Sequence, residues 1–108
     1  MRQALYPDFS LVIFRRCFMP KFLAVHPLPT HPTFAEAMPI ARMVKANSTV
    51  DAYWVRSYAQ LTEDRKIIKL FCEWNATKIE EIQKVLADIP LQTEGIYPMS
   101  IVDSEDFR

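Results

Sequence analysis

The only imidazole side chains of the sequence are His26 and His31, which makes them the candidate metal ligands. Neutral imidazole is the commonest protein ligand for nickel-like divalent metals. The two histidines are separated by five positions across a proline loop, so both could meet one ion only if that loop folds back. A symmetric dimer could instead bring His26 toward its mate or an acidic residue. We prefer the plainer interpretation, in which His26 is an ordinary residue of a sheet face and His31 belongs to the loop.

A second group of candidate residues lies on two predicted strands. Arg56, Tyr58 and Lys69 could bind an anionic or aromatic ligand, and Trp54 would add an aromatic ring to the same surface. The expected hairpin register places Arg56 opposite Lys69, a like-charge pair that is unfavourable unless a carboxylate neutralises it. Glu73 or a bound carboxylate could do so. The alternative, which we prefer, is a salt bridge between subunits.

The two cysteines, Cys17 and Cys72, stand far apart in the chain. This spacing is typical of free thiols in a reducing compartment rather than of a disulfide framework. A catalytic cysteine needs a neighbouring base to form its thiolate. The expected register places His26 near Ile67, away from Cys72, and strand alternation directs Cys72 into the core. We therefore expect a buried structural cysteine.

The composition excludes several classes of function. With 108 residues and 12.6 kDa the chain has room for one small domain. Its 13 basic and 13 acidic residues give a formal net charge of +0, without the basic excess of nucleic-acid binders. The only glycine, Gly95, excludes a glycine-rich phosphate loop. The apolar run Phe9–Phe14 is too short to cross a membrane, so we expect a soluble, cytoplasmic protein.

The order of elements predicts the fold class. Strands are expected at residues 21–26, 50–60, 65–74 and 95–102. One helix follows a capping box at Thr33 and contains Pro39, which should kink it or delay its start. The other is expected to begin after an N-cap at Asn75 and to stop at Pro90.

This β-α-β-β-α-β order predicts a ferredoxin-like α+β fold, a four-stranded antiparallel sheet with both helices on one face. Right-handed crossovers give the spatial strand order four-one-three-two. The fourth strand then lies at an edge, where Pro98 is tolerated.

Strand alternation divides the sheet residues between two faces. We expect a core face made by Leu23, Val25, Tyr53, Val55, Ser57, Ile68, Leu70 and Cys72. We expect an open face made by Phe22, Ala24, His26, Trp54, Arg56, Tyr58, Ile67, Lys69, Phe71 and Glu73. So aromatic a surface usually marks an interface, and two such sheets can pack face to face as a dimeric α+β barrel. We therefore expect a homodimer. The alternative is that residues 1–18 cover this face within one chain.

Residues 1–18 differ from the rest of the chain, carrying a net charge of +2 from three arginines and one aspartate. We treat them as an N-terminal extension that is either peripheral or due to a wrongly assigned start, because Met19 could be the true start. An arm or an additional strand is the alternative. Residues 19–108 form the expected ferredoxin-like domain.

Three short segments carry a resemblance to known proteins: Met19–Leu23, Trp54–Tyr58 and Cys72-Glu73. Through them residues 19–108 resemble a family of small bacterial ferredoxin-like domains of unknown function, one member of which is described as nickel-binding. The resemblance implies a ferredoxin-like homodimer with metal binding. The chain departs from the family in having only two histidines and in the proline of its first helix, and the family's ligands are not matched residue by residue.

Together these observations predict a small homodimer that binds a metal ion such as nickel, or a small ligand, at the open face, without a demonstrable catalytic set. The alternative is a cofactor-free oxygenase or isomerase of the dimeric α+β barrel kind, with His26 and Tyr58 as acid and base. A structural interaction domain is a third interpretation. RNA recognition is disfavoured, because the third strand lacks the basic-glycine-aromatic signature of such modules.

Overall fold

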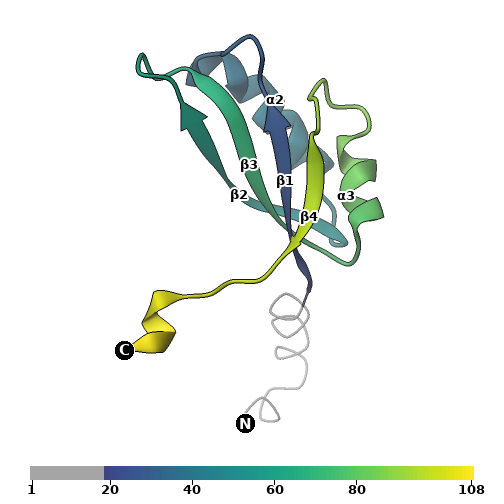
Figure 1. Ribbon diagram of the computed structural model, residues 1–108. Helices are drawn as coiled ribbons and strands as arrows, with labels where there is room; N and C mark the ends of the chain where they lie inside the picture. The colour runs from purple at the N-terminus through teal and green to yellow at the C-terminus, as the bar shows by residue number, and fades with distance from the viewer. Residues whose placement is uncertain (1–18) are drawn as a thin grey trace.

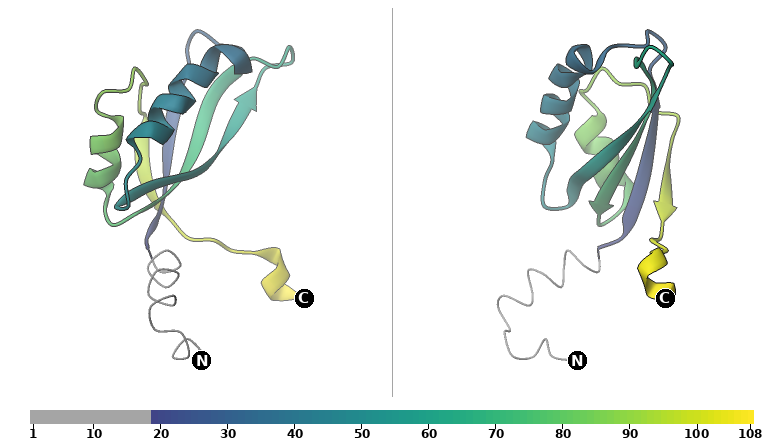
Figure 2. Two further views of the ribbon diagram at one scale, coloured as in Figure 1. Left: turned by 180° about the vertical axis from the view of Figure 1, so that it is seen from behind. Right: turned by 90° about the vertical axis from the view of Figure 1, so that its left-hand side faces the viewer.

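The computed structural model describes residues 19–108, and the expectations that concern residues 1–18, Cys17 among them, lie outside this range. The elements are β1 (Lys21–Pro27), α2 (Phe34–Asn47), β2 (Ala52–Leu61), β3 (Ile67–Ala76), α3 (Ile79–Leu86), β4 (Gly95–Met99) and the 3-10 helix η2 (Ser104–Phe107). The strands form one antiparallel sheet, and both helices lie on the same face of it (Figures 1 and 2). This α+β arrangement is compatible with a ferredoxin-like fold.

The hydrogen-bonded strand order is β2-β3-β1-β4, or four-one-three-two when read from the β4 edge. Pro98 lies in β4 opposite Phe22 of β1. Because β4 pairs with β1 alone, the proline needs to donate no hydrogen bond on its other side. The edge strand therefore accommodates a residue that a central strand would not.

Helix α2 begins with the capping box that the sequence predicts. The Thr33 hydroxyl accepts a hydrogen bond from the Glu36 amide at 3.2 Å, and the Glu36 carboxylate accepts one from the Thr33 amide at 2.9 Å. Pro39 lies inside the helix without delaying its start, which remains at Phe34. Two satisfied backbone donors thus fix the first turn ahead of the proline.

The predicted hairpin register is wrong. Arg56 pairs with Glu73 rather than with Lys69, and Tyr58 pairs with Phe71. The cause is a later and longer turn at residues 62–66, in which Arg65 adopts a positive φ of 65°. The Thr62 hydroxyl accepts a hydrogen bond from the Lys66 amide, which stabilises this turn. The like-charge pair expected from the sequence is therefore absent from the hairpin.

A bulge in β2 changes which side chains face the helices. The register shifts between Trp54 and Arg56, so that Val55 has no partner across the strand pair. Trp54 lies opposite Trp74 and Ser57 lies opposite Cys72, and all four share the face that the helices cover. The expectation that Trp54 lies on the open face is wrong for this reason, whereas Ser57 and Cys72 lie as expected.

The expected faces of β1 are exchanged. Phe22 and Ala24 belong to the core under the helices, and His26 lines a cavity on the same side. Leu23 and Val25 consequently lie on the open face. Both alternating sets of β1 are apolar, so hydrophobicity alone did not separate the two faces.

Two element boundaries also differ from expectation. Asn75 is not a helix cap, because β3 continues to Ala76 and α3 starts after Lys78, which makes no side-chain cap. The Asn75 side chain instead accepts a hydrogen bond from the Lys21 ammonium at 2.7 Å. At the other end of the chain, β4 stops at Met99, and the residues after it leave the sheet.

Helix α3 closes the apolar core at one side of the sheet. Its Ile82, Val85 and Leu86 are buried, together with Ile89 just beyond its end and Trp74 of β3. Full burial of such side chains contributes about 1.5–3 kcal/mol each. Among residues 19–108, no helix has the length and apolar character needed to span a membrane.

Removing the capping box should weaken α2. Thr33→Ala deletes the hydroxyl that satisfies the Glu36 amide, and the loss should lower the free energy of unfolding by about 1 kcal/mol. Urea unfolding measures this change, with Thr77→Ala as the control because Thr77 is an exposed threonine outside both helices. Equal effects of the two substitutions would contradict the assigned cap.

Candidate ligand-binding site

Helix α2 stands over the sheet without closing against it. Val44 is the one buried residue of its 14, whereas three of the eight residues of α3 are buried. A cavity of about 910 Å³ remains between α2, the sheet and the segment after α3. This volume lies within the range of small-molecule sites, about 300–1,000 Å³.

Most of the cavity wall is apolar. The end of β1 and the loop before α2 contribute Pro27, Leu28, Pro29, Thr30 and Pro32. Helix α2 contributes Phe34, Glu36, Ala37, Met38, Ile40, Ala41 and Val44. The strands contribute His26, Trp54, Ser57, Ile67, Leu70, Cys72 and Trp74, and the segment after α3 contributes Pro90, Leu91 and Gln92. Such walls favour apolar ligands, and the few polar groups among them fix a ligand's orientation.

His26 is the first of these polar groups and is fully buried. Its Nδ1 lies 3.0 Å from the backbone carbonyl oxygen of Gln92 and 3.2 Å from the Thr93 hydroxyl. A carbonyl oxygen can only accept, so Nδ1 carries the proton and donates it. The other nitrogen, Nε2, is then a bare acceptor, and it has no hydrogen-bond partner within residues 19–108. Burial lowers the pKa of His26, an effect that the bond to Gln92 partly opposes.

Trp74 is the second polar group of the cavity wall and is also fully buried. Its indole Nε1–H has no acceptor among the described residues. Trp54, directly opposite on β2, donates its own Nε1–H to the Ser57 hydroxyl at 2.8 Å. The two tryptophans of the wall therefore differ in their hydrogen bonding. The Nε1–H of Trp74 has no acceptor among the described residues, whereas the Nε1–H of Trp54 is already bonded to Ser57.

Cys72 lines the same cavity and is buried, as the sequence predicts. Burial raises the pKa of its thiol to about 11, against the smaller opposing effect of a hydrogen bond with Ser57. The thiol is consequently protonated near neutral pH and is a weak nucleophile. Its partner on β1 is Ala24, two positions from His26, so the two residues lie closer together than the predicted register implies.

The structure divides the predicted ligand residues between the two faces of the sheet. Trp54 lies in the cavity, whereas Arg56, Tyr58 and Lys69 lie on the open face. Arg56 Nε is 3.3 Å from a Glu73 carboxylate oxygen, and Lys69 Nζ is 3.1 Å from the carboxylate of Glu94. The two cations are thus each paired with a carboxylate of the same chain and do not form one pocket with Trp54.

The structure also separates the predicted metal ligands and the predicted acid–base pair. His26 is buried in the cavity wall, whereas His31 is exposed in the loop with a positive φ of 49° and does not line the cavity. Within residues 19–108 there is no group of three or more His, Cys, Asp and Glu side chains that could hold a metal ion. The described residues therefore assemble no such group, and the nickel binding that the resemblance implies stays a prediction. Tyr58 lies on the open face, on the opposite side of the sheet from His26.

Sequence reasoning missed Trp74 as a site residue. A signal was present, because Leu70, Cys72 and Trp74 alternate along β3 and the first two were assigned to the helix-covered face. Extending this alternation by two residues places Trp74 on the same face. The helix residues of the wall carry no comparable signal, because the cavity depends on how far α2 stands from the sheet.

The lowered pKa of His26 predicts a loss of stability in mild acid. Below the usual histidine pKa of about 6.5, the unfolded chain takes up a proton that the folded state does not bind, so stability falls as pH falls. Urea unfolding between pH 7.5 and 5.5 should show this decrease. It should be smaller in His26→Gln and largely retained in His31→Gln. An equal slope in all three proteins would contradict the assignment.

Comparison with known proteins supports the fold but does not identify a function. No protein-family model matches the chain, and no curated protein matches it. Among solved structures, the chain is similar to the crystal structure of SCO4226 from Streptomyces coelicolor A3(2), with a TM-score of 0.63 and 13% sequence identity. The match covers 77% of this chain and 99% of that chain. At this identity the likeness supports the α+β fold alone.

Proposed function

We propose that this protein binds a small, neutral and largely apolar molecule in the cavity between α2 and the sheet. The observation that supports this most strongly is the pair of unpartnered buried polar atoms, His26 Nε2 and Trp74 Nε1, on residues that line one cavity. The site differs from the expected one, since the predicted ligand surface was the open face. Binding of a small ligand is retained from the sequence analysis, at a new location.

His26 Nε2 and Trp74 Nε1–H form no hydrogen bond within residues 19–108, and this carries an energetic cost. Roughly nine in ten buried polar groups in proteins have a hydrogen-bond partner. Leaving one without a partner costs about 1–3 kcal/mol. Two such groups on one cavity wall are therefore best explained by a bound molecule that satisfies both. His26 Nε2 needs a donor and Trp74 Nε1–H needs an acceptor. The two residues lie four positions apart along the sheet, because His26 pairs with Leu70 and Trp74 pairs with Phe22, so each needs a polar group of its own.

The charges of the cavity wall favour a neutral ligand. Glu36 is the single carboxylate among the lining residues, and its carboxylate already caps the first turn of α2 through Thr33. Neither lysine nor arginine lines the cavity. An anionic ligand would lose its hydration there without gaining a cation, which costs several kilocalories per mole. An uncharged, largely apolar molecule with one or two polar groups fits this wall best.

Binding is favoured over catalysis by the state of the candidate reactive groups. The Cys72 thiol is protonated near neutral pH because its pKa is about 11. His26 could act as a base, but Tyr58, its predicted partner, belongs to the other face of the sheet. The oxygenase or isomerase alternative and the binding of nickel stay predictions, which turnover assays and a titration with Ni²⁺ would address.

A matched series of ligands tests the proposed hydrogen bonds. 4-Hexylphenol can donate and accept, 4-hexylanisole can only accept, and hexylbenzene can do neither. We expect 4-hexylphenol, which can donate to His26, and 4-hexylanisole, which can accept from Trp74, each to bind about fivefold more tightly than hexylbenzene, because one hydrogen bond contributes about 1 kcal/mol. Quenching of intrinsic fluorescence measures binding, since both tryptophans of the protein line the cavity. Equal affinities across the series, or binding of none, would contradict the proposal.

Two tryptophan variants form a matched pair for the same series. Trp74→Phe removes the unpartnered donor, and should abolish the preference for 4-hexylanisole over hexylbenzene while leaving the preference for 4-hexylphenol over hexylbenzene. Trp54→Phe removes a donor that is already bonded to Ser57, and should leave both preferences unchanged. Calorimetry suits these variants, because each retains a single tryptophan. The same result for both variants would show that Trp74 acts only through packing.

A further inference from the structure

The C-terminal arm, residues 100–108, extends away from the domain after β4 (Figures 1 and 2). Three large apolar side chains of the arm face solvent: Ile101 is 65% exposed, Val102 is 79% exposed and Phe107 is 75% exposed. Single exposed apolar residues are common, but three within nine residues of a projecting segment indicate a surface that becomes buried elsewhere.

The arm has local structure of its own. The Asp103 carboxylate accepts a hydrogen bond from the Glu105 amide at 3.0 Å and caps η2, which spans Ser104–Phe107. Arg108 and Glu105 form an ion pair at 2.7 Å. A segment that is already partly organised loses less conformational entropy when it binds a surface. The arm is therefore suited to docking.

The open face of the sheet offers a surface for such docking, because both helices lie on the other side (Figure 2). Tyr58 at 62% exposure and Tyr97 at 44% give it aromatic area, next to Phe71 and Leu23 on the neighbouring strands. The Tyr97 ring lies directly over Gly95, where a larger residue would meet it. This surface is apolar enough to gain from being covered.

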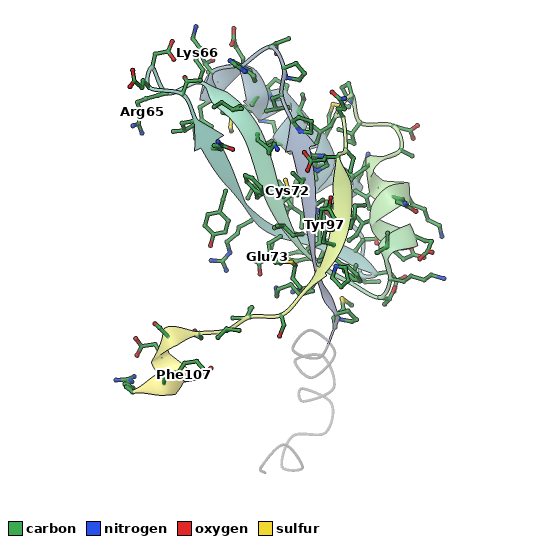
Figure 3. All side chains as sticks on the ribbon, viewed as in Figure 1. Arg65, Lys66, Cys72, Glu73, Tyr97 and Phe107 are labelled. Atoms are coloured by element: carbon green, nitrogen blue, oxygen red, sulfur yellow. The ribbon has the colours of Figure 1, made fainter. Side chains whose placement is uncertain are left out.

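Charge makes the arm and the open face complementary. Lys21 and Arg56 both form ion pairs with Glu73, so two cations share one carboxylate on the open face. Glu73 is labelled in Figure 3. The arm carries a net negative charge, from Asp103, Glu105 and Asp106 against Arg108. Opposite charges on two facing surfaces steer their encounter and fix their orientation.

We infer that the C-terminal arm of one copy binds the open face of a second copy, beside the cationic pair Lys21 and Arg56. Arm and face belong to the same chain, so a two-fold symmetric pair makes both contacts at once. This reciprocity lets a nine-residue arm contribute twice toward the roughly 1,600 Å² that a specific interface usually buries. The partner is therefore an identical chain, and the exchange of arms would organise the homodimer that the sequence predicts.

Molar mass by light scattering, measured over a dilution series, tests this inference. We expect the full chain to be a dimer, and the double variant Ile101→Asp/Phe107→Asp to dissociate at least tenfold more readily. Arg56→Glu should also weaken the dimer, because it places a carboxylate against an acidic arm. The control is Arg42→Glu, the same charge reversal on exposed α2. A chain ending at Met99, which keeps all four strands, should behave like the double variant.

Three outcomes would overturn the inference. A monomeric full chain would mean that the open face is exposed or covered within one chain, for example by residues 1–18. A dimer equally stable without the arm would place the interface elsewhere. Equal weakening by Arg56→Glu and Arg42→Glu would show that the charge of the open face has no specific role. None of these outcomes bears on the cavity, which lies on the other face of the sheet.

Discussion

The hydrogen bond from His26 Nδ1 to the carbonyl oxygen of Gln92 determines which nitrogen of His26 is left as an acceptor in the cavity wall. It ties the end of β1 to the segment that leads into β4, and it assigns the proton to Nδ1. Burial lowers the pKa of the ring and favours its neutral form. His26 Nε2 is consequently an unpartnered acceptor in the same apolar wall as Trp74, whose Nε1–H also has no partner within the described residues. A donor group of a ligand would satisfy the first, and an acceptor group would satisfy the second.

The position of α2 supplies the space for that ligand. Its capping box fixes where the helix begins, and the small side chains Ala37 and Ala41 line the cavity without filling it. Helix α3 does the opposite, because its larger aliphatic residues close the core over Trp74. One helix thus stabilises the sheet while the other forms a wall, and this division of roles explains how a chain of 108 residues can hold both a core and a cavity.

The sequence predicted the order of the elements and the capping box at Thr33, because these features depend on local chemistry. It placed the faces of β1 wrongly, since both alternating sets of that strand are apolar and carry no contrast. The bulge at Val55 and the turn with Arg65 at positive φ changed the hairpin register, and neither has a glycine to mark it. Of the predicted site residues, His26 and Trp54 line the cavity. His26 does so because the faces of β1 are exchanged, and Trp54 does so because of the bulge at Val55. The cavity itself could not be predicted, because it depends on a helix-to-sheet spacing that no local pattern encodes.

The two indole N–H resonances of the protein offer the most direct test of the account. In a two-dimensional ¹H–¹⁵N spectrum they are assigned by Trp54→Phe, and 4-hexylanisole, which can only accept a hydrogen bond, is then added to the wild-type protein. We expect the Trp74 signal to move downfield as its donor gains an acceptor, while the signal of Trp54, which is already bonded to Ser57, changes little. A Trp74 signal that does not move at saturating ligand, or that shifts no more than that of Trp54, would contradict the proposed site.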